Sequence, residues 1–175
     1  PQLVLAGGGG FVWGDTFVVS RFRDSLRQYE SEAWENFFLV RGYDTKTLSE
    51  GCYFGGEQDL LIVEGTPFVG YRSGDDLAAH NALSTILGCD VRLLRFADGW
   101  DLPLSACLCP LGNGQALFYP EAFDLDARRT IEGSLAVPRA MDPRDVRRFG
   151  CNALVVGGDL ILPEGCVATV AQLKQ

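Results

Sequence analysis

The sequence predicts a mixed α/β domain that repeats a small unit of hairpin, helix and returning strand. Short apolar runs meet in pairs at glycine-rich turns, which is typical of β-hairpins. Helical patterns follow these hairpins, and no linker or low-complexity segment interrupts the alternation along the 175 residues. With 47% hydrophobic and 22% charged residues, the chain has the composition of one globular domain, residues 1–175.

The N-terminal part predicts two strands followed by a helix. Residues 3–6 and 17–19 are short apolar runs that flank the glycine-rich stretch 7–10. That stretch is not a phosphate-binding loop, because neither Gly-Lys-Ser/Thr nor a helix follows it. Residues 31–40 predict a helix with Ser31 as its N-cap.

The middle of the chain predicts one complete unit. Its hairpin turns on Glu64 and Gly65, and its helix ends before Gly88, a residue type that is common just past helix C-termini. The predicted elements are strands over residues 60–63 and 67–70, a helix over residues 75–87 and a returning strand over residues 91–96.

The C-terminal part predicts two further hairpins. The first turns on the Gly-Asn-Gly sequence of residues 112–114, and the second turns on Gly157 and Gly158. Asp142 and Pro143 predict the N-cap and the first residue of a short helix. The other predicted elements are strands 104–108 and 115–119, a helix 124–132, strands 153–156 and 160–162, and a helix 166–174.

Charge and cysteine content narrow the classes of function. The net charge is −8 and no basic cluster exceeds Arg144, Arg147 and Arg148, so we expect no nucleic-acid partner. No apolar run is long enough to span a membrane and no signal peptide is present, so we expect an intracellular protein of the cytoplasm or the mitochondrial matrix. The six cysteines lack the paired spacing of zinc sites, which predicts buried reduced thiols, no metal and no cofactor.

Four stretches carry a resemblance to a known family. They are FVWGDTFVVSRF (residues 11–22), CYFGGEQDLL (52–61), FVGYRSGDDLAAH (68–80) and CNALVVGGDLILPEG (151–165). In this order, and over nearly the whole chain, they resemble the amidinotransferase and dimethylarginine dimethylaminohydrolase-like branch of the pentein superfamily. The resemblance implies a propeller of ββαβ blades around a pseudo-five-fold axis. Because relatives extend beyond Pro1 and Gln175, we expect this propeller to be incomplete at both ends.

The resemblance also implies a site for guanidines. In relatives a cysteine thiolate attacks the guanidine carbon, a histidine transfers protons and acids hold the guanidinium. Asp15 matches the clamping acid, Asp59 matches the acid that pairs with the histidine, and Arg72 matches a position that contacts substrate. An ion pair of Arg72 with Asp75 or Asp76 is an equally weighted alternative for that arginine.

Several positions depart from the family pattern. The His-x-Asp pattern is replaced by Pro103 and Ser105, and proline cannot act as a base. Gly55 stands where relatives commonly have Glu. None of the six cysteines matches the nucleophile, including Cys166 at a helix start, and His80 belongs to a helix away from the chemistry, where a surface or capping role is expected.

These losses predict a catalytically inactive amidinotransferase-like protein, a pseudoenzyme that acts as a structural or accessory subunit of a larger intracellular complex. Asp15, Asp59 and Arg72 would form a vestigial guanidinium-binding site that faces a central cavity. Other subunits would cover the strand edges that an incomplete propeller exposes. The alternative is an arginine or dimethylarginine hydrolase with a cysteine nucleophile, seen as a truncated chain, and a guanidinium sensor is a third possibility.

Overall fold

A repeated ββαβ unit organises the molecule. The computed structural model describes residues 8–72 and 74–174, so the strand expected over residues 3–6 lies outside the described residues. Within the described part there are four β-sheets, and three of them have the same topology. In each of the three, an antiparallel hairpin is followed by a helix and by a third strand that pairs parallel with the second. The expected mixed α/β class is confirmed.

The first unit contains β1 (Gly10–Trp13), β2 (Thr16–Val19), α1 (Gln28–Leu39) and β3 (Asp44–Thr47). Strand β2 confirms the predicted strand over residues 17–19, whereas β1 and β3 were not predicted. Strand β3 has no apolar residue and is largely exposed, so it lacks the hydrophobic signal of a strand. The expected Ser31 cap is wrong, because α1 begins earlier, after the 3-10 helix η2 (Ser25–Arg27), and the Ser31 hydroxyl donates to the Ser20 carbonyl at 2.7 Å.

The second and third units follow the predicted order closely. They contain β4 (Leu60–Val63), β5 (Thr66–Tyr71), α2 (Gly74–Leu87) and β6 (Arg92–Arg95), then β7 (Leu108–Gly112), β8 (Gln115–Phe118), α3 (Leu125–Ser134) and β9 (Val137–Ala140). The strand expected over residues 104–108 is wrong for most of its length, since residues 104–106 form the 3-10 helix η4 (Leu104–Ala106). Strand β9 was not predicted, because Pro138 and Arg139 interrupt its apolar pattern.

The C-terminal part contains a hairpin between two helices. Its elements are α4 (Pro143–Val146), β10 (Leu154–Val156), β11 (Asp159–Ile161) and α5 (Val167–Leu173). Asp142 caps α4 as predicted, because its Oδ1 accepts from the Arg144 N–H at 2.8 Å. The pair β10 and β11 is a two-stranded sheet within the described residues.

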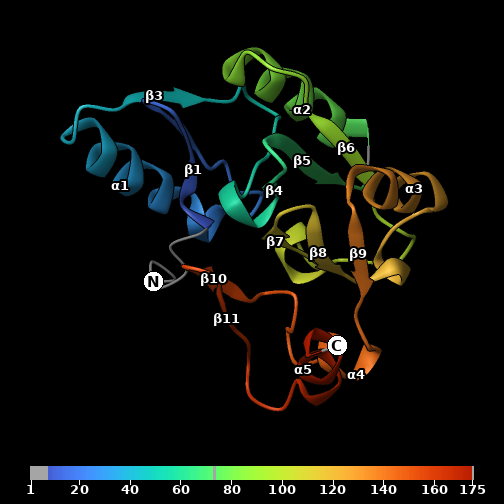
Figure 1. Cartoon of the computed structure of the whole chain (residues 1–175). Coiled ribbons are helices and arrows are strands. Elements are labelled where there is room, and N and C mark those ends of the chain that lie inside the picture. The colour runs from blue at the N-terminus through green and yellow to red at the C-terminus, as the bar shows by residue number, and fades with distance from the viewer. Residues whose placement is uncertain (1–7, 73, 175) are drawn as a thin grey trace.

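The units are arranged with their helices on the outside. Figure 1 shows α1, α2 and α3 along the periphery, while the first strand of each hairpin, β1, β4, β7 and β10, lies toward the middle. Buried side chains form clusters between and beneath these strands, with Leu60, Leu94 and Leu117 fully buried. The arrangement therefore brings residues of four separate hairpins to one central region.

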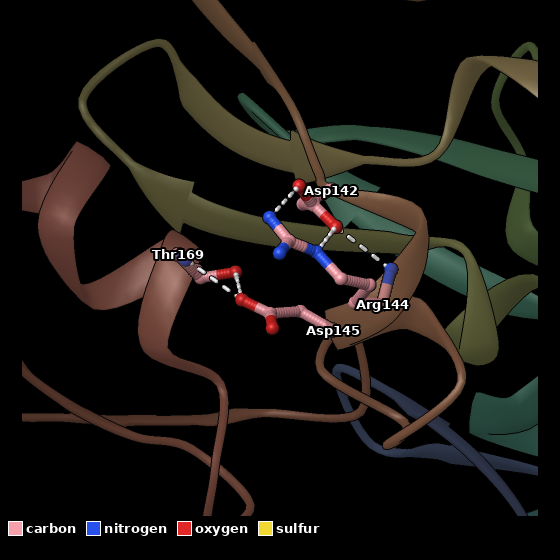
Figure 2. A network of polar contacts seen from close by, with 4 residues as sticks. All are labelled: Asp142, Arg144, Asp145 and Thr169. Atoms are coloured by element: carbon pink, nitrogen blue, oxygen red, sulfur yellow. Dashed lines mark hydrogen bonds and ion pairs between the residues drawn. The ribbon is translucent and has the colours of Figure 1, made fainter.

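A buried carboxylate joins the two C-terminal helices (Figure 2). Asp145 of α4 is 3% exposed, and its Oδ2 accepts from both the N–H and the hydroxyl of Thr169 at 2.7 Å. Helix α5 has no side-chain cap at Cys166, so Asp145 satisfies a free N–H of its first turn. Because the β10–β11 hairpin lies between α4 and α5 in the chain, this contact holds both ends of the segment that carries the hairpin.

Candidate functional site

The inner strands surround an open cavity of about 720 Å³, here called the central cavity. This volume is within the usual range of small-molecule sites. Its walls come from all four hairpins and are largely apolar. The strands contribute Phe11 of β1, Leu60 and Ile62 of β4, Leu108 and Cys109 of β7, and Val155 of β10.

Glu57 is the one carboxylate among the described residues that line the central cavity. The 3-10 helix η3 (Gly56–Gln58) carries it. Gly56 has φ +63, and a Cβ there would lie 2.4 Å from the Gly10 carbonyl oxygen, so only glycine lets this turn pack against β1. The Glu57 side chain is exposed, and partial desolvation by the neighbouring residues raises the pKa of its carboxyl.

Glu57 was not predicted as a site residue, because the family pattern matches its acid to Asp59 two residues later. A signal was available: Glu57 follows two consecutive glycines, Gly55 and Gly56. A glycine pair before an acid indicates a tight turn that presents the acid from a loop, where functional side chains are frequent.

Pro103 and Ser105 also line the central cavity. Pro103 precedes η4 with an extended backbone, at φ −68 and ψ 169. The two positions where relatives carry His and Asp therefore line the central cavity, and neither proline nor serine has a side chain that titrates.

Two buried cysteines, Cys109 and Cys151, complete the wall of the central cavity. Desolvation raises the pKa of Cys109 to about 11, and it raises the pKa of Cys151 well above the usual value. Both side chains are therefore neutral thiols near pH 7. Since the thiolate is the reactive form, neither is an activated nucleophile.

A smaller pocket of about 210 Å³ adjoins the central cavity at η3, and Gln58 lines both. Its charged lining is Arg21, Arg23, Arg27, Asp59, Arg72 and His80. Four guanidinium groups against one carboxylate give this space, here called the arginine pocket, a positive potential that favours an anionic group.

Arg27 and Arg72 make contacts with neighbouring segments of the chain. Arg27 pairs with Glu30 at 3.0 Å, and the Glu30 side chain is only 2% exposed. Arg72 donates to the carbonyl oxygens of Trp100 at 3.2 Å and Leu102 at 2.6 Å. These bonds tie the arginine pocket to the segment that leads to Pro103. The alternative ion pair of Arg72 falls on Asp75 and Asp76, whose side chains lie outside the described part.

The structure brings together two of the three residues that the resemblance grouped, because Asp59 and Arg72 both line the arginine pocket and Asp15 does not. Asp15 is exposed in the β1–β2 turn and lines neither the central cavity nor the arginine pocket. Asp59 lines the arginine pocket, and its Oδ2 accepts from the Gly55 N–H at 2.8 Å. The role of Asp15 and Asp59 in holding a guanidinium stays a prediction. They do not line one of these two spaces together, and Gly10, at the other end of β1 from Asp15, packs against Gly56. Each strand residue between them adds about 3.3 Å.

His80 lies in a different environment from the one expected, and Cys166 is not an activated thiol. His80 is 3% exposed and makes an edge contact with Tyr71 at 5.6 Å between ring centroids, so a surface role is wrong. Cys166 is buried, and desolvation together with Asp145 raises the pKa of its thiol. Among the side chains that the structure describes, no cluster of three His, Cys, Asp or Glu residues could hold a metal ion. Over the same residues, no helix is long and apolar enough to cross a bilayer.

The chain is similar to known enzymes over almost its whole length. A bifunctional arginine dihydrolase/ornithine cyclodeaminase of Nostoc sp. is 35% identical over 166 residues, which are 93% of this chain and 24% of the relative. The N(G),N(G)-dimethylarginine dimethylaminohydrolase of Mycobacterium tuberculosis is 30% identical over 177 residues, 99% of this chain and 57% of the relative. The N-terminal domain of ArgZ, a cyanobacterial arginine dihydrolase, was crystallised as a cysteine-to-serine variant bound to substrate. It matches with a TM-score of 0.88 and 29% identity, over 99% of this chain and 66% of that one. No family model matches the chain.

The chain belongs to the pentein superfamily, in its amidinotransferase and dimethylarginine dimethylaminohydrolase-like branch. It spans 24% of the bifunctional relative and 57% of the dimethylarginine dimethylaminohydrolase. The comparisons overturn the expectation of a catalytically inactive pseudoenzyme and accessory subunit, because these relatives are hydrolases and one similar structure holds substrate. That expectation depended on Pro103 and Ser105 in place of the His-x-Asp pattern and on the lack of a cysteine that matches the nucleophile, whereas the similarity extends along the chain.

Proposed function

We propose that this chain forms the substrate-binding part of a guanidine-modifying hydrolase that acts on arginine or a methylarginine. One observation carries the proposal: a cavity with a single carboxylate, Glu57, adjoins a pocket with four arginines across the η3 turn. Arginine has a cationic guanidinium at one end and a carboxylate at the other. A space with one acid that adjoins a space with four arginines suits the two ends of such a molecule.

Each end of the substrate has a chemical partner. Glu57 accepts hydrogen bonds from the guanidinium in the central cavity, where charge-assisted bonds are strong. Arg27 and Arg72 receive the carboxylate in the arginine pocket, because planar guanidinium groups match carboxylate geometry. Asp59, in the same pocket, is placed to receive the α-ammonium group. Asp15 has no role in this proposal.

The nucleophile of the proposed reaction comes from outside these 175 residues. Cys109 and Cys151 are the cysteines that line the central cavity, and their raised pKa values keep them as thiols. A cysteine thiolate supplied by further polypeptide would add to the guanidine carbon, as the resemblance implies. The relative crystallised as a cysteine-to-serine variant with its substrate supports this assignment.

We also propose that the ββαβ units are blades of a five-fold propeller and that further polypeptide completes it. In each complete unit the second strand pairs with a parallel third strand. Strand β11 is the second strand of the fourth hairpin, and the exposed fractions of Leu154 and Ile161 are 60% and 58%. A parallel strand along β11 would cover this edge. A structure of the natural-length protein in which β11 keeps a bare edge would contradict this.

The decisive experiment measures ammonia or amine release by the natural-length protein from arginine, dimethylarginine and agmatine. Agmatine lacks the carboxylate, so we expect it to react with at least tenfold lower kcat/KM. Arg72→Gln should remove this preference by raising the KM for arginine about tenfold or more, because a charged hydrogen-bond partner is lost. Arg92→Gln, at an exposed position of β6, is the matched control and should change neither value.

Three outcomes would overturn the proposed function. One is absence of turnover with all three guanidines. The second is binding of arginine without turnover, which indicates a sensor. The third is equal turnover of agmatine and arginine, which would remove the arginine pocket from the assignment.

A further inference from the structure

Among the described residues that line the central cavity there is no histidine, so proton transfer by these residues requires another group. Among the described residues that line it, the titratable side chains are Glu57, Cys109 and Cys151. Both thiols are buried and neutral, so neither exchanges a proton readily near pH 7. Pro103 and Ser105, on the same wall, carry no group that titrates in that range.

We propose that Glu57 is the proton-transfer residue of the reaction, in the place that a histidine occupies in relatives. The inference rests on the proposed function and assigns a role within the same site. Glu57 lies on a turn that Gly56 locks against β1, and it lines a cavity that also contains Pro103 and Ser105. Glu57 is thus the one acid among the described residues of the cavity that also contains the position of the replaced histidine, Pro103.

The environment of Glu57 suits proton transfer. Desolvation raises the pKa of its carboxyl from 4.5, and no charged side chain lines the central cavity beside it among the described residues. The cations that are near, Arg21, Arg23, Arg27 and Arg72, line the arginine pocket on the other side of η3. A carboxyl with a pKa nearer to neutrality can both give and take a proton during turnover.

The reaction balances with Glu57 in this role. A cysteine thiolate from further polypeptide forms an S–C bond to the guanidinium carbon. Protonated Glu57 gives its proton to the leaving nitrogen, and the C–N bond breaks to release ammonia or an amine. The Glu57 carboxylate then takes a proton from the attacking water as the C–O bond forms. The C–S bond breaks, its electron pair returns to sulfur, and the protonated ureido product loses a proton to solvent.

The test compares pH–rate profiles of the natural-length protein and three variants. Wild-type kcat should fall as pH rises through the Glu57 pKa, because the proton donor is lost. Glu57→Gln should lower kcat about a hundredfold or more and abolish this alkaline limb. Glu57→Asp should keep a shifted limb with lower kcat. Glu132→Gln, at an exposed position of α3, is the control and should match wild type.

The outcomes separate this inference from the proposed function. Activity of Glu57→Gln within twofold of wild type, with the same limb, overturns the inference alone. A Glu57→Gln variant that raises KM but keeps the limb shows a clamp without proton transfer and also overturns it. Inactivity of the wild-type protein overturns the proposed function and this inference together. Circular dichroism melting of each variant, with Glu57→Asp as the conservative change, distinguishes lost chemistry from lost fold.

Discussion

The two faces of the η3 turn differ sharply in charge. On one face, the central cavity is walled by apolar strands, two neutral thiols and Glu57. On the other, the arginine pocket holds four guanidinium groups and Asp59. Only Gln58 lines both spaces among the described residues. The contrast teaches that a turn of three residues is enough to separate a largely apolar space from a strongly charged one.

The difference arises from which parts of the units contribute. The central cavity is built from inner strands, whose side chains alternate between the core and the middle of the molecule. The arginine pocket is built from residues that follow β2, from the segment before β4 that contains η3, from β5 and the residue after it, and from α2. Long arginine side chains at these strand ends carry their charge beyond the apolar core.

The largest expected effect comes from breaking the turn that both spaces share. Gly56→Ala forces a Cβ to within 2.4 Å of the Gly10 carbonyl oxygen at φ +63. Left-handed strain and overpacking together should lower the free energy of unfolding by about 4 kcal/mol. Gly65→Ala is the matched control, at φ +77 with no atom within 4 Å, and should cost only about 1 kcal/mol. Urea denaturation measures both, and equal losses would contradict the close packing of η3 on β1.

The second effect concerns the arginine pocket alone. Arg27→Met leaves the Glu30 carboxylate, 2% exposed, without its 3.0 Å partner. We expect the free energy of unfolding to fall by about 3 kcal/mol, because an unpaired buried charge is costly. The double variant Arg27→Met/Glu30→Gln should recover more than half of that loss. A double variant no more stable than Arg27→Met would show that the arginine acts through packing on Phe22 instead.

The third effect concerns the contact between α4 and α5, the helices on either side of the β10–β11 hairpin in the chain. Asp145→Ala removes both bonds to Thr169 and should lower the free energy of unfolding by about 2 kcal/mol. Asp142→Ala, in the same network but with an exposed partner in Arg144, should cost less. Thermal melting of the two variants checks the order. The reverse order would remove Asp145 from the contact between α4 and α5.

The smallest expected effect concerns the protonation state of Cys109 on the wall of the central cavity, and its measurement leaves the fold unchanged. Cys109 is 5% exposed and its pKa is raised to about 11, so its thiolate fraction increases as pH rises toward that value. Alkylation of Cys109 at pH 8 should be about a hundredfold slower in the folded protein than in urea, and it should accelerate with pH. Peptide mass spectrometry of iodoacetamide-treated protein measures this. Labelling of Cys109 as fast as that of the half-buried Cys89 would show that the Cys109 thiol is neither buried nor raised in pKa.

Turns were the part of the fold that local sequence predicted best. Glu64-Gly65, Gly-Asn-Gly and Gly157-Gly158 located three hairpins, and Asp142 with Pro143 located the start of α4. These signals work because a positive φ or a fixed φ restricts the residue types at single positions. Strands β3 and β9 escaped prediction, because an outer strand that packs little apolar surface carries no alternating pattern.

The site was harder to predict than the turns. The sequence by itself determined the ββαβ repeat, the mixed α/β class and the resemblance to guanidine-processing penteins, since these depend on local patterns in order along the chain. Only the tertiary structure decided that Glu57 lines the central cavity, that Asp59 lines the arginine pocket, and that Asp15 lines neither. The physical reason is that the pocket a side chain lines depends on the direction in which its turn packs against the rest of the fold. That direction is set by contacts such as the one between Gly56 and Gly10, which are distant in sequence.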